Sequence, residues 1–187
     1  MKRVVSFLLT LCLLLTALLS GAALAEGSTQ ITIGLVGAPD TIIPYMYTAD
    51  KDAMVIMQMM PYLFKRNDET SIPEPLMLES CELDADTLTY TWKLREGYTW
   101  TDGEPLTIDD VIFTLNTLAS ADYTGGASTS VSGIAGYAEA HSGETAGMSG
   151  VQKVDDYTMT VQLSAWDPTF LGYYCDPGAI LPEHVLS

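Results

Sequence analysis

The sequence predicts a mixed α/β (α+β) domain. Residues 88–94 alternate between apolar and polar side chains, which is the period of a strand with one buried face. Residues 108–118 place apolar side chains three and four positions apart, which is the period of an amphipathic helix. A further alternating stretch at residues 151–163 predicts a second hairpin, so strands and helices mix along one chain.

A secretory signal peptide is predicted at residues 1–25. Its front is basic, residues 4–19 are apolar, and small residues precede the expected cleavage after Ala25. The apolar run is shorter than the roughly 20 residues that a membrane span needs. Cys12 lies inside this run and follows Leu11, so there is no clear lipobox. We therefore expect a secreted protein in the periplasm or at the outer cell surface.

The charge of the chain argues against one class of partner. The formal net charge is −16, and cleavage makes it more negative because Lys2 and Arg3 are lost. No basic cluster opposes this charge, so we predict that the chain does not bind nucleic acid. Residues 26–187 are enough for one domain with a core.

Two cysteines, Cys81 and Cys175, follow the predicted leader. An exported chain could join them in a disulfide, provided that their Cα atoms approach within about 7 Å. Cys81 also fits a small buried side chain at the start of a strand. The sequence leaves both alternatives open.

The first predicted elements are a strand, a loop and a helix. Ile31, Ile33 and Leu35 alternate with other residues and predict a strand. Residues 37–47, with two prolines, are predicted to form a loop. Residues 52–60 are good helix formers. We interpret the methionines of this helix as core residues that fill gaps: Met54, Met57, Met59 and Met60.

A β-hairpin and a capped helix come next. Residues 84–86 form the predicted turn between a short strand and the alternating strand, whose Tyr90 and Trp92 point inward. After a tight turn at residues 102–105, Thr107 is a suitable N-cap, and Asp110 three residues later completes a capping box. The apolar face of the helix consists of Ile108, Val111, Ile112, Leu115 and Leu118.

Residues 122–150 change composition to glycine, serine, alanine and threonine. This composition predicts a long surface loop or a flexible insertion. The second hairpin follows, with its turn at Asp155-Asp156.

No catalytic arrangement is apparent in the sequence. His141 and His184 lie outside any known catalytic motif, and we interpret both as solvated surface residues. Asp109-Asp110 falls in the first turn of a helix and Asp155-Asp156 in a tight turn, where carboxylates have structural roles. Gly125-Gly126 lacks the lysine of a phosphate loop. We therefore predict no enzyme activity, no cofactor and no metal site.

Binding fits the aromatic residues better than catalysis does. Tyr45, Tyr47, Tyr98 and Trp100 lie at strand ends and turns, where they would line a cleft or simply be exposed.

Several blocks of the chain resemble one protein family. LTYTWKLREGYTWTDGEPLTIDDVIFTL, residues 88–115, resembles the signature of extracellular solute-binding proteins of family 5, the peptide/nickel-type components of ABC importers. TIIP, IPEPLMLESCE, VQKVDDYTMTVQL and ILPEH resemble further family blocks in the same order. Two positions depart from the family pattern: Ile43 replaces an Asp and Cys81 replaces an aromatic residue.

The resemblance implies a fold and a function. The fold is the first lobe of a bilobal periplasmic-binding protein of type II, cluster C, and it is incomplete because family members are much longer. The implied function is to capture an extracytoplasmic oligopeptide, as a monomer, and to deliver it to an ABC permease and ATPase complex. Nickel and haem are the less favoured ligands, because the chain has two histidines.

By the same resemblance, the residues that face ligand are those after the first strand: Gly37, Ala38, Pro39, Asp40, Tyr45 and Tyr47. The alternative function is that of a truncated lobe without a transport role, acting as a surface interaction or peptide-sensing module. Half of a cleft binds ligand weakly, which favours this alternative if the gene ends at Ser187.

Overall fold

The computed structural model describes residues 31–174 and 178–187. The chain divides into two units, Met1–Leu35 and Val36–Ser187, and all helices and strands of the described residues belong to the second. The signal peptide and Cys175 lie outside the described residues, so the cleavage site stays a prediction, while Cys81 is a free cysteine in the structure.

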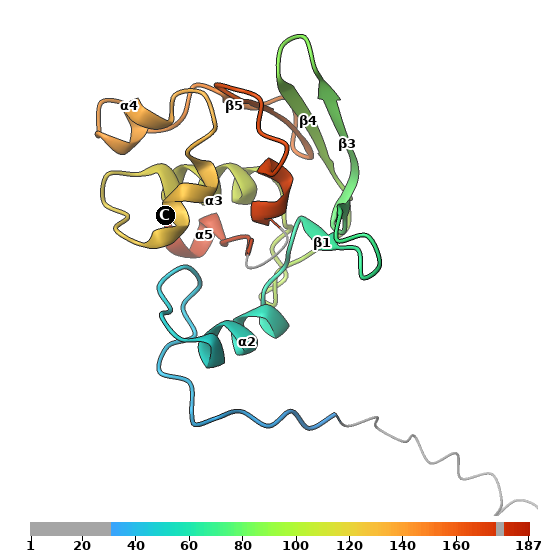
Figure 1. Cartoon of the computed structure of the whole chain (residues 1–187), viewed down its shortest axis with the longest axis vertical. Coiled ribbons are helices and arrows are strands. Elements are labelled where there is room, and N and C mark those ends of the chain that lie inside the picture. Colours follow the sequence, from blue (N-terminus) through green and yellow to red (C-terminus); the bar gives the residue numbers. More distant parts are fainter. Residues whose placement is uncertain (1–30, 175–177) are drawn as a thin grey trace, which may run out of the picture. The chain divides into compact units, whose positions relative to one another are not determined.

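The observed fold mixes helices and strands, as the sequence predicts (Figure 1). The helices are α2 (Asp50–Met59), α3 (Ile108–Ala119), α4 (Tyr137–His141) and α5 (Glu183–Leu186), with 3-10 turns η2 (Gly126–Val131) and η3 (Phe170–Tyr174). The strands are β1 (Phe64–Arg66), β2 (Pro73–Pro75), β3 (Leu78–Asp84), β4 (Thr89–Leu94), β5 (Val151–Lys153) and β6 (Thr158–Gln162).

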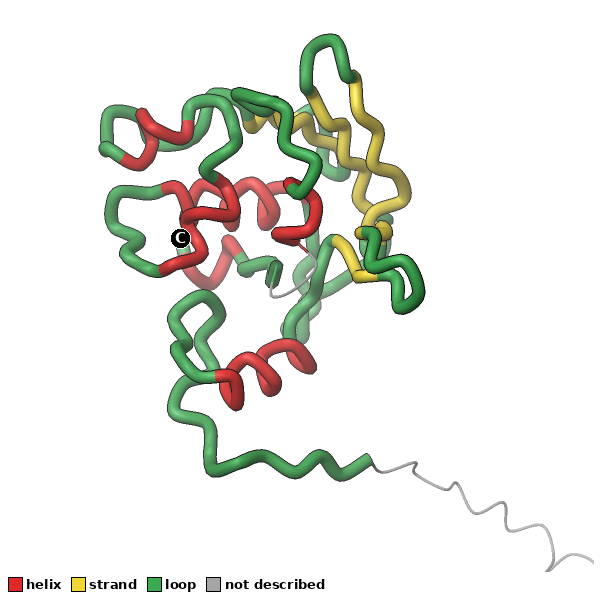
Figure 2. The backbone as a smooth tube through the Cα atoms, viewed as in Figure 1, coloured by secondary structure: helices red, strands yellow, loops and turns green. Residues whose placement is uncertain are grey.

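Both predicted hairpins are confirmed, and they join into one antiparallel sheet of order β3-β4-β6-β5. In the register of this sheet, Trp92 lies opposite Cys81 on one side and Met159 on the other. Strands β1 and β2 form a separate two-stranded sheet. Figure 2 shows the strands in yellow beside the red helical segments of the same unit.

The core is organised around the indole of Trp92, which is fully buried. The ring of Phe64 contacts it edge to face at a centroid distance of 5.6 Å, and Tyr174 does so at 5.3 Å. Phe170 stacks beside it at 6.2 Å. Aromatic pairs in these geometries add to the stabilisation that burial alone provides. The inward orientation predicted for Tyr90 and Trp92 is therefore confirmed.

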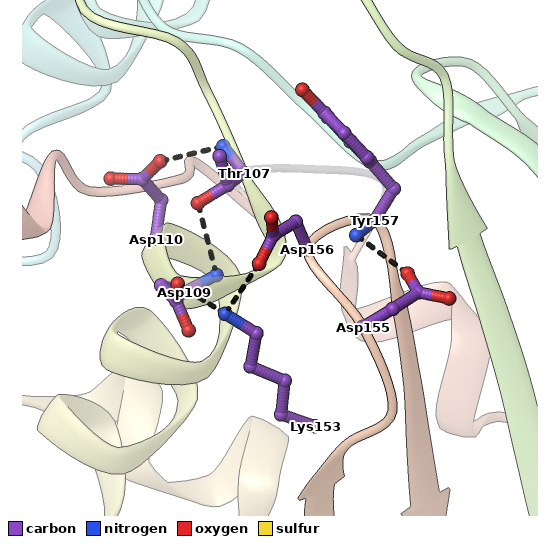
Figure 3. Close-up of polar contacts among 7 residues, drawn as sticks. All are labelled: Thr107, Asp109, Asp110, Lys153, Asp155, Asp156 and Tyr157. Carbon is purple, nitrogen blue, oxygen red and sulfur yellow. Dashed lines mark hydrogen bonds and ion pairs between the residues drawn. The ribbon is translucent and has the colours of Figure 1, made fainter.

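The predicted capping box is present at the start of α3. The Thr107 hydroxyl accepts a hydrogen bond from the Asp109 N–H, and the Asp110 carboxylate accepts one from the Thr107 N–H at 2.9 Å (Figure 3). Asp110 is 4% exposed and accepts two further bonds, from the Trp100 indole at 3.3 Å and the Glu183 N–H at 2.9 Å. The cap therefore also ties the helix to a preceding turn and to the start of α5.

Two predictions in the first part of the chain are wrong. Residues 31–35 form no strand, because alternation alone does not suffice and no described strand pairs with them. Helix α2 forms as predicted, but its buried residues are Asp52 and Ile56. The methionines are not core residues, because Met54, Met57 and Met59 are 46%, 37% and 60% exposed, while Met60 is half-buried.

The segment 122–150 is more structured than its composition predicts. It contains η2 and α4, and it contributes four buried side chains to the core, Val131, Ile134, Ala140 and Met148. The prediction of a surface loop or flexible insertion is therefore wrong for η2, for α4 and for these buried side chains. Small residues allow close packing here: a Cβ on Gly150 would lie 2.6 Å from the Gln162 carbonyl oxygen.

We expect Asp110→Ala to lower the free energy of unfolding by about 2–4 kcal/mol, because three donors lose one acceptor in a buried position. Urea denaturation followed by tryptophan fluorescence measures the loss. The matched control is Asp109→Ala, which removes a half-exposed ion pair with Lys153 and should cost less than about 1 kcal/mol. Equal losses for the two variants would contradict this role of Asp110.

A pH-dependent contact is expected between His184 and Asp102, whose Nε2 and Oδ2 atoms lie 2.8 Å apart. The hydrogen bond to Asp102 raises the pKa of His184 above its ordinary value of 6.5, and the same bond lowers the pKa of Asp102. The stability that His184 contributes is therefore complete below about pH 6.5 and is lost as the pH rises through the raised pKa.

The expected result is that His184→Asn shifts the urea midpoint more at about pH 5.5 than at about pH 8.5. His141→Asn is the control, because His141 stacks on Tyr137 and makes no ion pair with a described residue. A His184→Asn effect that is the same at both pH values would show that the contact does not depend on charge.

Candidate functional site

The predicted ligand-facing segment, Gly37 to Asp40, is exposed and held from one side by α2. The Lys51 ammonium donates to the Ala38 carbonyl at 2.7 Å and pairs with the Asp40 carboxylate at 2.8 Å. The Asp40 N–H donates to the carboxylate of Asp52, which is 1% exposed. This geometry presents a fixed stretch of backbone to solvent.

Tyr45 and Tyr47 lie elsewhere, in the wall of a pocket. The pocket has two adjoining hollows of about 350 and 380 Å³, which share Tyr45, Tyr47, Tyr123 and Gly126 in their lining. Asp122 lies in the wall of the second hollow, and the first is completed by Ala127, Ser130, Gly172 and Tyr173. We call this the tyrosine pocket. Hollows of a few hundred Å³ are in the range of small-molecule and side-chain sites.

The backbone of Tyr45 is in an unusual conformation, with φ of 62°. A non-glycine residue in this left-handed region costs about 1–2 kcal/mol. Two contacts offset the cost: the Tyr45 hydroxyl donates to the Ala179 carbonyl, and the Tyr45 carbonyl accepts from the Tyr123 hydroxyl at 2.9 Å. Tyr45 is thus fixed at both its side chain and its backbone, and it forms a rigid wall of the pocket.

Because Gly125 has no side chain, the ring of Tyr123 can lie against it in the pocket. A Cβ at Gly125 would overlap the Tyr123 hydroxyl, so no larger residue fits there without moving the ring. The sequence pair Gly125-Gly126 therefore serves to seat an aromatic ring and to line the hollow.

The phenols of Tyr45, Tyr47 and Tyr123 stay protonated at neutral pH, because the pKa of each is raised. Burial raises the pKa of Tyr45, and the neighbouring Tyr123, Tyr62 and Tyr47 add to the shift. Burial also raises the pKa of Tyr47, with smaller contributions from Tyr123 and Asp50, and burial raises that of Tyr123. The pocket therefore presents neutral aromatic rings and hydroxyl groups to a ligand.

The structure brings together two of the six predicted site residues, Tyr45 and Tyr47. None of the other four appears in the described lining of the tyrosine pocket. Tyr123, Tyr173 and Asp122 are pocket residues that the sequence analysis missed. An aromatic residue followed closely by two glycines was the available signal for Tyr123. Trp100 is not in the described lining of this pocket, and its indole donates to Asp110.

The paired carboxylates have structural partners (Figure 3). The Lys153 ammonium lies 2.7 Å from Asp109 and 3.0 Å from Asp156, and these contacts raise the pKa of Lys153. Asp155 accepts from the Tyr157 N–H at 2.8 Å, which lowers the pKa of Asp155. The two pairs thus close a turn against the start of α3.

The Cys81 thiol is half-buried. Burial raises the pKa of the Cys81 thiol to about 11, so this cysteine is protonated and a poor nucleophile at neutral pH. No group of three or more His, Cys, Asp or Glu side chains in residues 31–174 and 178–187 is placed to hold a metal ion. Within the same residues, the helices are too short or too polar to cross a membrane.

Comparisons with known proteins identify the family of the chain. The family described as bacterial extracellular solute-binding proteins, family 5 Middle, matches residues 73–185. The oligopeptide-binding protein AppA of Bacillus subtilis is 31% identical over 175 residues, which are 90% of this chain and 29% of AppA. The chain therefore spans less than a third of this relative.

Solved structures show the same fold. The substrate-binding domain of an oligopeptide ABC transporter from Bacillus anthracis superposes with a TM-score of 0.67 and 25% identity, over 75% of this chain and 27% of the other. Bacillus subtilis AppA in complex with a nonapeptide gives 0.62 and 28%, over 75% and 25% of the two chains. The relatives are solute-binding proteins, which are not enzymes. The chain belongs to the bacterial extracellular solute-binding proteins of family 5.

Proposed function

We propose that this chain belongs to the substrate-binding component of an ABC importer and contacts an oligopeptide outside the cytoplasm. The observation that carries the proposal is the family match, together with relatives that are named for oligopeptide binding and one that was solved with a nonapeptide. Delivery to a permease and ATPase complex, and action as a monomer, follow from the same family role.

Two surfaces of the chain support peptide contact. Residues 37–40 are exposed, and their Ala38 carbonyl and Asp40 N–H are bonded to Lys51 and Asp52, so an extended peptide would pair with other backbone groups of the segment, the Ala38 N–H and the Pro39 and Asp40 carbonyls. The tyrosine pocket offers a hollow that accommodates a side chain between neutral rings. We propose Gly37, Ala38, Pro39 and Asp40 as backbone contacts, and Tyr45 and Tyr47 as side-chain contacts.

We expect Tyr47→Leu to weaken peptide binding by about tenfold, because the variant removes one aromatic wall of the pocket. Isothermal titration of the purified chain with alanine-based pentapeptides measures the affinity, and circular dichroism confirms that the variant folds. Tyr98→Leu is the matched control, since Tyr98 is 38% exposed and lies outside the described pocket lining.

Equal affinities of the Tyr47→Leu and Tyr98→Leu variants would remove the tyrosine pocket from the proposal. Absence of binding by the unaltered, folded chain up to about 1 mM peptide would overturn the proposed function itself.

A further inference from the structure

Asp122 is the one charged residue in the described lining of the tyrosine pocket, and a cation, Arg66, lies near the first hollow, where its Nη2 would be 4.0 Å from a Cβ on Gly172. Asp122 lies in the wall of the second hollow, and its carboxylate makes no ion pair with a described residue. The described lining of both hollows contains no Lys, Arg or His. The whole chain carries a net charge of −16, so its more distant charges together add to the negative electrostatic potential at the pocket.

Three hydroxyls of the lining have already used their only proton. The Tyr45 hydroxyl donates to the Ala179 carbonyl, and the Tyr123 hydroxyl donates to the Tyr45 carbonyl. The Ser130 hydroxyl donates to the Ala127 carbonyl at 2.7 Å. A hydroxyl has one donor and two acceptor lone pairs. Each of these oxygens therefore has only acceptor capacity left for a ligand.

We propose that the tyrosine pocket selects a cationic side chain, the ammonium of lysine or the guanidinium of arginine, from the bound peptide. The inference rests on the proposed function and names the side-chain class that the pocket takes. Acceptor oxygens, the Asp122 carboxylate and aromatic faces all attract such a group, because a cation is favoured both by lone pairs and by the negative face of an aromatic ring.

Two other side-chain classes fit the pocket less well. A ligand carboxylate can accept from the Tyr47 and Tyr173 hydroxyls, but it meets the Asp122 carboxylate and no Lys, Arg or His in the described lining, so it is disfavoured. A neutral aliphatic side chain fills the volume but leaves the acceptors without a donor. The nearby Asp50 adds to the negative field, because its charge contributes to the raised pKa of Tyr47.

The test compares pentapeptides that differ in one side chain. Lysine, its uncharged near-isostere norleucine, and glutamate are placed in turn at each position of an alanine pentapeptide, and affinities for the purified chain are measured by isothermal titration. We expect the lysine peptide to bind about fivefold to twentyfold more tightly than the norleucine peptide at one position, and the glutamate peptide to bind least.

Asp122→Asn should reduce the preference for lysine over norleucine at least about threefold while the norleucine affinity is retained. Asp86→Asn is the matched control with the same charge change, because Asp86 is an exposed turn residue whose side chain makes no hydrogen bond or ion pair with a described residue. The Asp86→Asn variant should keep the full preference.

Equal binding of the lysine and norleucine peptides at all positions would overturn the cationic preference and leave the proposed function standing. A preference that survives Asp122→Asn unchanged would overturn the assignment to this pocket. Binding of none of the peptides by the folded chain would overturn the proposed function and this inference together.

Discussion

The arrangement of helix α3 and its neighbouring segments depends on the hydrogen bonds that the buried carboxylate of Asp110 accepts. It accepts from the Thr107 N–H, the Trp100 indole and the Glu183 N–H, and so joins a turn, a helix and the last described segment. One turn along the helix, the Thr114 hydroxyl donates to the Asp110 carbonyl and accepts from the Leu181 N–H at 2.8 Å. A buried carboxylate is tolerated in such a place only because donors surround it.

The contacts around Asp110 also affect the geometry of the candidate site, because they position a chain segment next to Tyr45. Asp110 and Thr114 hold residues 181 and 183, which places the nearby Ala179 carbonyl where the Tyr45 hydroxyl can donate to it. Tyr45 in turn accepts from Tyr123, and the pocket wall is complete. The signature that looks like a functional motif in the sequence is therefore architectural, and its effect on the site is indirect.

The sequence predicted those features whose cause is local. The alternation around Trp92 and the spacing of Thr107 from Asp110 fix a hairpin and a cap within a few residues. The predictions failed where the cause is distant. The exposure of Met57 depends on which face of α2 is packed, and Ile134 is placed by an isolated bridge to Leu163, the residue that follows β6. The tyrosine pocket requires contacts across 78 and 134 residues, which no local pattern encodes.

The bond between Tyr45 and Ala179 also has a consequence for the order of folding. A chain made from its N-terminus contains Tyr45 long before it contains the carbonyl that the phenol needs. Until then the left-handed backbone at Tyr45 has no compensating contact at the side chain, and closing so long a loop is slow. The wall of the tyrosine pocket is therefore complete only when residue 179 is present and the chain has closed on itself.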